Sequence, residues 1–226
     1  MRVRIVSALS TAALALILVA SAREMKADVI FSNFGAGQTY QGASWWDVGA
    51  TSGAGSPAQV VAFPFMVSQT STLTGADLAL ASLAGSPTPV NVFIESSSGG
   101  APGTILDTLT QSGSLPTYPT TAVVNFACSG SCSVLDAGTT YWIVGQASDD
   151  ANLAGWLWSL SSSGNWFFNQ TDSATGPWDP TTNPISAFDV TGVAATSPVP
   201  EPASLALLGT GLLGVFAMTR RNAWKR

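Results

Sequence analysis

The sequence predicts an all-β protein. We expect a single β-sandwich or jelly-roll domain over residues 28–196, between an N-terminal signal peptide and a C-terminal transmembrane helix. Short runs of alternating apolar and polar residues recur along this body, and Gly-, Ser- and Pro-rich turns separate them. The body shows no amphipathic helix pattern and no internal repeat. Apolar runs at both chain ends are typical of segments that enter membranes.

The N-terminus has the three parts of a secretory signal. Arg2 and Arg4 are basic, residues 8–19 are apolar, and Ala20-Ser21-Ala22 has the small-x-small form that signal peptidase cleaves. We therefore predict a signal peptide over residues 1–22. An uncleaved anchor is the alternative, but the apolar run is short and a cleavage site follows it directly.

The strands are predicted from period-two alternation. In residues 90–95, Val90, Val92 and Ile94 fall on one face and the residues between them on the other. Residues 35–55 are predicted to form a long loop, and Pro64 favours an edge or bulge position for its strand. The predicted strands occupy residues 29–34, 59–67, 72–82, 89–96, 104–109, 122–126, 139–147, 155–159, 166–169 and 185–193.

Charge is distributed unevenly along the chain. All eight Lys and Arg lie within residues 2–26 or 220–226, there is no His, and the body has a formal charge of −11. Such a body repels nucleic acid, because binding to phosphates requires Lys and Arg. The body carboxylates are Asp28, Asp47, Asp77, Glu95, Asp107, Asp136, Asp149, Asp150, Asp172, Asp179 and Asp189.

The missing residue types also limit catalysis. Without His, no Ser-His-Asp or Cys-His relay and no imidazole metal site can form. A body without Lys forms no Schiff base and no P-loop. A carboxylate-pair glycosidase remains the enzyme alternative, but Glu95 is the only Glu of the body and nothing in the sequence pairs it with an Asp. We expect Glu95 to be a solvated carboxylate at a strand end, and the protein to be non-enzymatic.

Cys128 and Cys132 are the only cysteines and flank the turn-like triplet Ser-Gly-Ser. An oxidising exported environment permits them to form a disulfide, which we predict as a structural link. A redox or metal role is the alternative. It is disfavoured because no neighbouring cation would lower a thiol pKa.

No cofactor is expected, although calcium is considered because it binds carboxylate and carbonyl oxygens. Asp149, Asp150 and Asn152, with Gly155, partly imitate a calcium loop. Ala154 and Ser161 stand where an EF-hand loop needs further ligands, so exposed Asx turns are the favoured interpretation.

Three Trp side chains in predicted loops suggest an alternative function. Trp45 and Trp46 precede Asp47, and Trp178 precedes Asp179. Aromatic rings beside carboxylates could form a lectin-like platform on which sugars stack. Burial under long loops is the more common role of such rings.

The C-terminal tail has three consecutive parts. A Pro-rich linker over residues 197–202 contains Pro200, Glu201 and Pro202, and an uncharged apolar run follows over residues 203–219. As a helix this run spans about 25 Å, enough to cross a thin bilayer. The basic residues beyond it would remain cytoplasmic by the positive-inside rule. These basic residues, within 220–226, are Arg220, Arg221, Lys225 and Arg226.

This tail resembles the PEP-CTERM sorting signal of Gram-negative bacteria. The resemblance implies that exosortase, a membrane protease, processes the tail near the Pro-Glu-Pro motif. It also implies an inner-membrane anchor before processing and a later location at the cell surface or in the extracellular matrix. An ordinary C-terminal membrane anchor is the alternative.

The body resembles, more weakly, the choice-of-anchor β-sandwich domains found before such tails. The shared features are Phe93-Ile94, then Gly99 to Gly103 with Leu106, and the strand containing Tyr141-Trp142-Ile143. This resemblance implies a fold and no activity. We expect an exported structural or adhesive protein of the exopolysaccharide of a biofilm, with extracellular polysaccharide as its partner. A lectin-like carbohydrate-binding module, with or without calcium, is the alternative.

Overall fold

A computed structural model of the chain describes residues 27–49, 58–84, 89–148 and 152–195. Every named element in these ranges is a β-strand, which confirms the all-β prediction. None of the described residues forms a helix with the length and apolar character needed to cross a membrane. The strands are β1 (Asp28–Ser32), β2 (Trp45–Gly49), β3 (Val60–Met66), β4 (Ser71–Ala84), β5 (Val90–Ser98), β6 (Ala101–Gln111), β7 (Ala122–Cys128), β8 (Val134–Leu135), β9 (Thr140–Ala147), β10 (Leu153–Asn169), β11 (Asp179–Ser186) and β12 (Phe188–Ala194).

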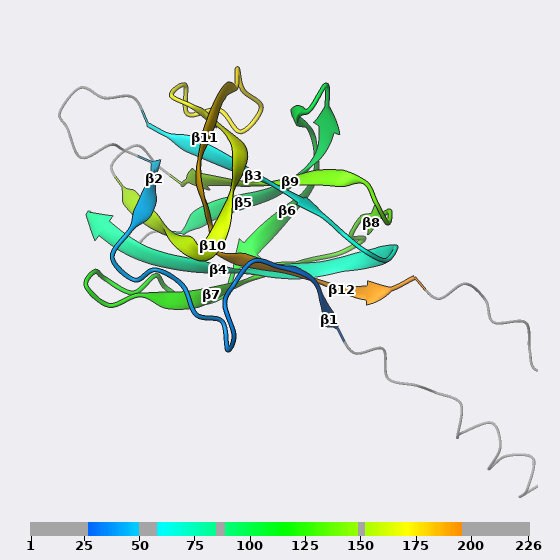
Figure 1. Cartoon of the computed structure of the whole chain (residues 1–226), viewed down its shortest axis with the longest axis horizontal. Coiled ribbons are helices and arrows are strands. Elements are labelled where there is room, and N and C mark those ends of the chain that lie inside the picture. Colours follow the sequence, from blue (N-terminus) through cyan, green and yellow to red (C-terminus); the bar gives the residue numbers. More distant parts are fainter. Residues whose placement is uncertain (1–26, 50–57, 85–88, 149–151, 196–226) are drawn as a thin grey trace, which may run out of the picture. The chain divides into compact units, whose positions relative to one another are not determined.

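The strands form one large antiparallel sheet that folds over itself. Its order is β1-β12-β4-β7-β6-β5-β9-β3-β10-β11, and a further pairing of β4 with β10 joins distant parts of this path. Figure 1 shows β4, β7 and β12 in one layer and β3, β5 and β9 in the other. The two layers thus belong to a single hydrogen-bonded sheet.

The long strand β10 links the layers. Its first part pairs with β2 over Leu153 to Leu157 and with β4 over Leu153 to Trp156. Its last part, Phe167 to Asn169, pairs with β3 on the other layer. The register with β11 shifts between Trp158 and Ser163, where the strand changes layers. The two strands predicted over residues 155–159 and 166–169 are therefore the two ends of one strand.

The interior lies between the layers and follows the alternation that the sequence predicted. On β3, Val61, Phe63 and Phe65 belong to the main core cluster, whereas Val60 and Ala62 face the opposite way. The ring of Phe63 lies 4.9 Å from that of Trp156, edge to face. Burial of aromatic and branched side chains supplies the main stabilising free energy of such a fold.

Each outer face carries a smaller apolar cluster under a connecting segment. The first consists of Val60, Ala62, Trp142, Val144 and Ala174, with Phe93, Ile105, Phe167 and Trp178 against it. Because Ala174 and Trp178 come from the connection between β10 and β11, we call this the 170–178 face. The second consists of Ala79, Ala81, Leu157 and Ala187, with Phe34, Tyr40 and Trp45 against it. We call it the 33–44 face, after the connection between β1 and β2.

Three strands differ from the sequence expectation. The predicted loop over residues 35–55 contains β2, where Trp45 and Trp46 pair with Leu157 and Trp156 of β10. The prediction that these Trp residues lie in a loop is therefore wrong. The single strand predicted over residues 185–193 covers only the end of β11 and most of β12, so the sequence does not predict β11 as a strand of its own. Strand β11 includes Pro180 and Pro184 and borders only β10 in the sheet path, the edge position that proline tolerates. Strand β8 has two residues, too few for a periodic signal.

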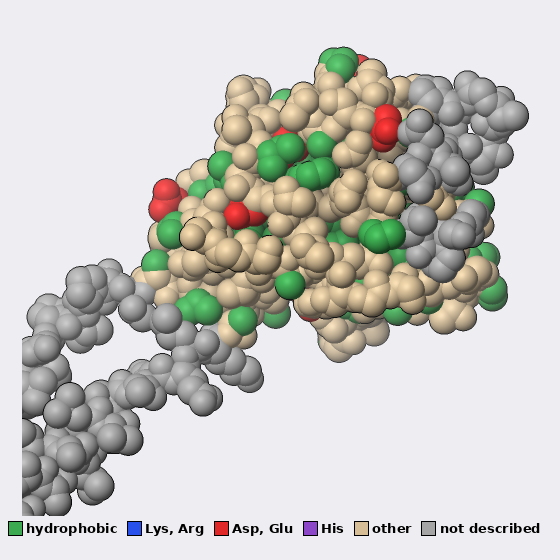
Figure 2. Space-filling model, turned by 180° about the vertical axis from the view of Figure 1, so that it is seen from behind, with side chains coloured by type: hydrophobic (Ala, Val, Ile, Leu, Met, Phe, Trp, Pro, Cys, Tyr) green, Lys and Arg blue, Asp and Glu red, His purple; other side chains and the backbone are tan. Residues whose placement is uncertain are grey.

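The described surface has no basic side chain, since all Lys and Arg lie at residues 2–26 and 220–226. The face in Figure 2 accordingly shows scattered acidic groups among polar and apolar surface. Carboxylates in this part of the chain therefore rely on neutral hydrogen-bond donors.

Candidate functional site

Several predicted sites fall outside the described residues. These are the signal peptide over residues 1–22, the tail from residue 197 onward, and Asp149 and Asp150 of the calcium loop. The third residue of that loop, Asn152, is buried immediately before β10.

The three Trp residues of the lectin hypothesis lie in three different environments. Trp46 packs against the main core, and its Nε1 donates a hydrogen bond to the Pro184 carbonyl oxygen at 2.8 Å. Trp45 packs on the 33–44 face, and Trp178 on the 170–178 face. The structure does not bring these rings together as one platform.

Trp45 also affects the nearest carboxylate. Its Nε1 donates to Asp47 Oδ1 at 3.2 Å. Burial raises the pKa of Asp47, and this hydrogen bond from Trp45 opposes the rise by favouring the charged form. The indole thus acts as a neutral partner for an acid in a body that lacks cations.

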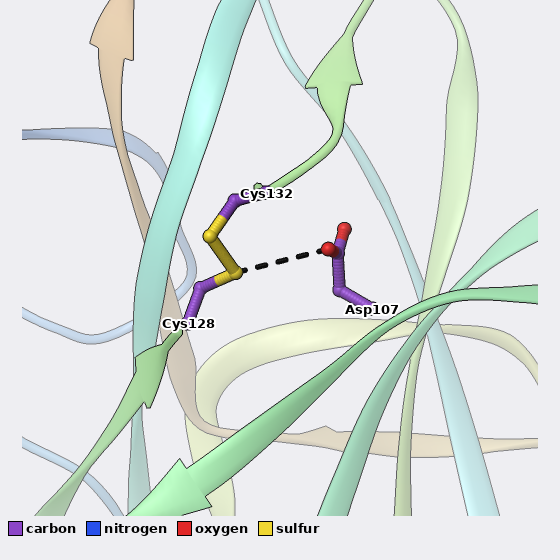
Figure 3. A group of neighbouring side chains, drawn as sticks. All are labelled: Asp107, Cys128 and Cys132. Carbon is purple, nitrogen blue, oxygen red and sulfur yellow. Dashed lines mark hydrogen bonds between the residues drawn. A yellow bond between two sulfur atoms is a disulfide. The ribbon is translucent and has the colours of Figure 1, made fainter. Parts of the chain in front are cut away.

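A disulfide joins Cys128 and Cys132, with an S–S distance of 2.06 Å. Asp107 of β6 approaches it, and Figure 3 marks the 3.7 Å separation between Asp107 Oδ1 and Cys128 Sγ. A disulfide sulfur has no hydrogen to donate, so this approach is a contact and not a hydrogen bond. The backbone N–H of Ser133 donates to both Asp107 oxygens, at 3.3 and 3.2 Å. The three side chains could gather around a metal, but a closed disulfide offers no thiolate ligand.

Glu95 differs most from its sequence prediction. It is fully buried, with an exposed fraction of 0 %, so the expectation of a solvated strand-end carboxylate is wrong. It lies opposite Trp142 on β9 and Ile105 on β6, both members of the 170–178 face. Among the described residues, neither Glu95 oxygen has a hydrogen-bond partner.

This environment changes the acidity of Glu95. Burial raises its pKa from 4.5 to about 7, because the charged form loses its hydration without gaining a partner. The indole N–H groups of Trp142 and Trp178 are also buried and unpaired among the described residues. The 170–178 face therefore holds a carboxyl group that is mostly neutral below pH 7 and about half ionised near pH 7.

A second group of acids lies on the 33–44 face. Asp77 of β4 and Asp189 of β12 are direct cross-strand partners. Gln38 Nε2 donates to Asp189 Oδ2 at 2.9 Å, and Asn125 Nδ2 donates to Asp77 Oδ1 at 2.9 Å. Asp189 Oδ1 is buried and, among the described residues, has no partner.

Two open grooves lie near the β5–β6 hairpin. One, of about 500 Å³, is lined by side chains that include Ser96, Leu106, Ser133 and Thr139. The other, of about 490 Å³, is lined by Gly100, Asn165, Phe167, Pro180, Thr181 and Thr182. Both grooves combine hydroxyl groups with an apolar patch.

The sequence carried only partial signals for these features. Alternation on β5 placed Glu95 opposite the core-facing residues, but the 170–178 segment that contributes to this face lies about 80 residues away in the chain. Asp77 and Asp189 had no detectable link, because their opposition depends on the pairing of β4 with β12. The absence of Lys, Arg and His in the body was the one available indication that buried acids would need unusual partners.

The chain was also compared with known proteins. No curated protein matches it. Residues 198–221 match the family model of the PEP-CTERM protein-sorting motif, which confirms the resemblance of the tail to that sorting signal. The chain carries the PEP-CTERM sorting motif and is thereby marked as an exported protein that is membrane-anchored before exosortase recognises it.

Proposed function

We propose that this protein is a non-catalytic structural or adhesive component of the extracellular polysaccharide matrix. The observation that carries the proposal is the sorting motif over residues 198–221, which directs the chain to exosortase. Removal of the signal peptide and of the apolar run over residues 203–219 would release the β-domain at the cell surface.

The properties of the β-domain support a role outside the cell. Its described part is stabilised by an apolar interior and a disulfide, and it contains no Lys or Arg that could form salt bridges. Because the described part has no internal ion pairs, added salt should not weaken its fold by screening them. Hydroxyl and amide groups on its surface can bond a hydrated polysaccharide.

Intact-mass analysis of the protein from its native host tests the sorting step. Cell-bound and secreted fractions are compared, and the expected mature species begins at Arg23 and ends near Pro200-Glu201-Pro202. A species that retains residues 203–226 in both fractions would instead identify a plain membrane anchor. Substitution Glu201→Ala should prevent processing, whereas Glu24→Ala, outside the motif, should not.

Co-fractionation tests the matrix role separately. The processed protein should accompany exopolysaccharide and should appear in the free medium when polysaccharide synthesis is blocked. If processing is normal and the protein never associates with polysaccharide, the matrix role fails while the sorting assignment stands.

A lectin-like module is the second candidate, and one observation favours it. The 490 Å³ groove combines the ring of Phe167 with hydroxyl groups of Thr181 and Thr182. Phe167→Ala should then weaken binding to isolated exopolysaccharide. Trp45→Ala, Trp46→Ala and Trp178→Ala test the original three-Trp platform in the same assay. If all four variants bind exopolysaccharide as tightly as the wild type, both versions of the lectin hypothesis are excluded.

The absence of catalysis is part of the proposal. Glu95 has apolar cross-strand neighbours, Trp142 and Ile105, and thus no opposed carboxylate for a glycosidase pair. Polysaccharide hydrolysis by the purified protein that disappears in Glu95→Gln would overturn this part.

A further inference from the structure

A pair of like charges lies in an unusual position on the 33–44 face. Asp77 and Asp189 are directly opposed across β4 and β12, where side-chain Cβ atoms are about 4.5–5.5 Å apart. Phe188 and Val190, on either side of Asp189, point into the main core, so Asp189 itself points outward with Asp77. Like charges directly opposed in a sheet are destabilising.

The charge of this pair lacks a cationic partner in the described part of the chain, which contains no Lys, Arg or His. Asp189 is only 3 % exposed, and its Oδ1 is buried without a hydrogen-bond partner among the described residues. A buried carboxylate oxygen without a donor, beside a second carboxylate, concentrates negative charge that a bound cation would compensate.

Oxygen-bearing side chains surround the pair. Gln38 contacts Asp189, Asn125 contacts Asp77, and Ser32 is the β1 partner of Asp189. Both amides present nitrogen to the carboxylates, which is the favoured orientation without a cation. Rotation of each amide by half a turn would present oxygen instead. Asp77 is half-buried and Asn125 is exposed, so a hydrated ion can approach from that side.

We propose that Asp77 and Asp189 bind a calcium ion between β4 and β12. Asp189 Oδ1 and the Asp77 carboxylate supply its charged ligands. The Gln38 and Asn125 amide oxygens, with water, complete a hard-oxygen coordination shell. This site is separate from the loop of Asp149, Asp150 and Asn152. With two carboxylates, a dissociation constant on the order of 0.1–1 mM is expected, the range of extracellular calcium modules.

Thermal unfolding of the full chain in detergent, with and without calcium chloride, tests the site. Calcium at 10 mM, about ten times the upper expected dissociation constant, should raise the Tm. Sodium chloride at equal ionic strength corrects for general screening of the acidic body. The calcium-dependent rise should be lost in Asp77→Asn and in Asp189→Asn.

Asp179→Asn is the matched control, because it removes an equal charge from an exposed position on β11. It should retain the calcium-dependent rise. A wild-type protein without such a rise, or a rise that persists in both pair variants, overturns the proposal. If Asp189→Asn fails to fold, the half-buried Asp77→Asn decides the outcome alone, with near-UV circular dichroism as the check of its fold.

Discussion

The two outer faces of the β-domain bury carboxylates in different ways. On the 33–44 face, Gln38 and Asn125 each donate to one acid of the Asp77–Asp189 pair. On the 170–178 face, Glu95 lies among apolar side chains and has no partner among the described residues. Burial alone raises the pKa of Glu95 to about 7.

The difference shows how a protein body without cationic side chains can accommodate buried acids. Neutral donors stabilise the charged form on one face, and on the other a bound proton removes the charge. Both arrangements lower the cost of a buried carboxylate, which is several kcal/mol for an isolated buried anion. Three substitutions test this contrast between the two faces.

The largest effect is expected for Glu95→Gln. Because the folded-state pKa of about 7 exceeds the reference value of 4.5, the folded protein binds more protons than the unfolded protein between these values. Wild-type stability should therefore fall as pH rises from 4.5 to 7, by about 3 kcal/mol in total. Glu95→Gln should remove this fall, so that it exceeds the wild type by about that amount at pH 8 and equals it near pH 4.

Urea unfolding at intervals from pH 4 to pH 8 measures this effect. Asp179→Asn, at an exposed position, serves as the control and should follow the wild-type profile. Parallel profiles for Glu95→Gln and wild type would show that Glu95 is ionised and solvated in the folded protein.

A smaller effect is expected for Gln38→Asn in calcium-free buffer. Gln38 has a φ of 57°, which Asn tolerates well, so the backbone is preserved while the amide becomes too short to reach Asp189. Loss of a donor to a buried carboxylate should destabilise the protein by about 1–2 kcal/mol. Gln41→Asn is the control, because Gln41 Nε2 donates to the neutral Ser159 carbonyl at 3.3 Å. If both variants lose the same amount of stability, the hydrogen bond from Gln38 to the Asp189 carboxylate contributes no more than the one from Gln41 to a neutral carbonyl.

The smallest effect is expected for Asp77→Asn in the same calcium-free buffer. Removal of one of two opposed charges should stabilise the fold by about 0.2–1 kcal/mol. Chemical unfolding at pH 7 measures the change. A marked loss of stability would contradict the view that the two opposed carboxylates repel each other in the folded protein.

The sequence predicted much of the fold from local patterns. Alternation over Val90 to Glu95 identified β5 and its core-facing side chains, and the predicted strand over residues 59–67 matches β3. Alternation failed at β2, where Gly- and Ser-rich neighbours conceal a short strand that forms by pairing with β10. It also divided β10 in two, because the central residues Ser161 to Gly164 carry no apolar alternation.

Candidate site residues were harder to predict than strands. Period two places Glu95 and Asp77 on the faces opposite the core, and outward-facing acids are ordinarily solvated. Whether an outer face is exposed depends on where distant connecting segments lie. The 170–178 and 33–44 segments contribute apolar side chains to these two faces, and that arrangement cannot be read from residues near Glu95 or Asp77.

The sequence by itself determined the all-β class, the acidic body without basic side chains and the sorting motif of the tail. These follow from composition, short-range periodicity and a linear motif, each readable within a few tens of residues. Only the tertiary structure decided that the sheet folds over through β10, that Glu95 is buried, and that Asp77 opposes Asp189. These features depend on strand register and on contacts between residues as many as 112 positions apart, which local patterns do not encode.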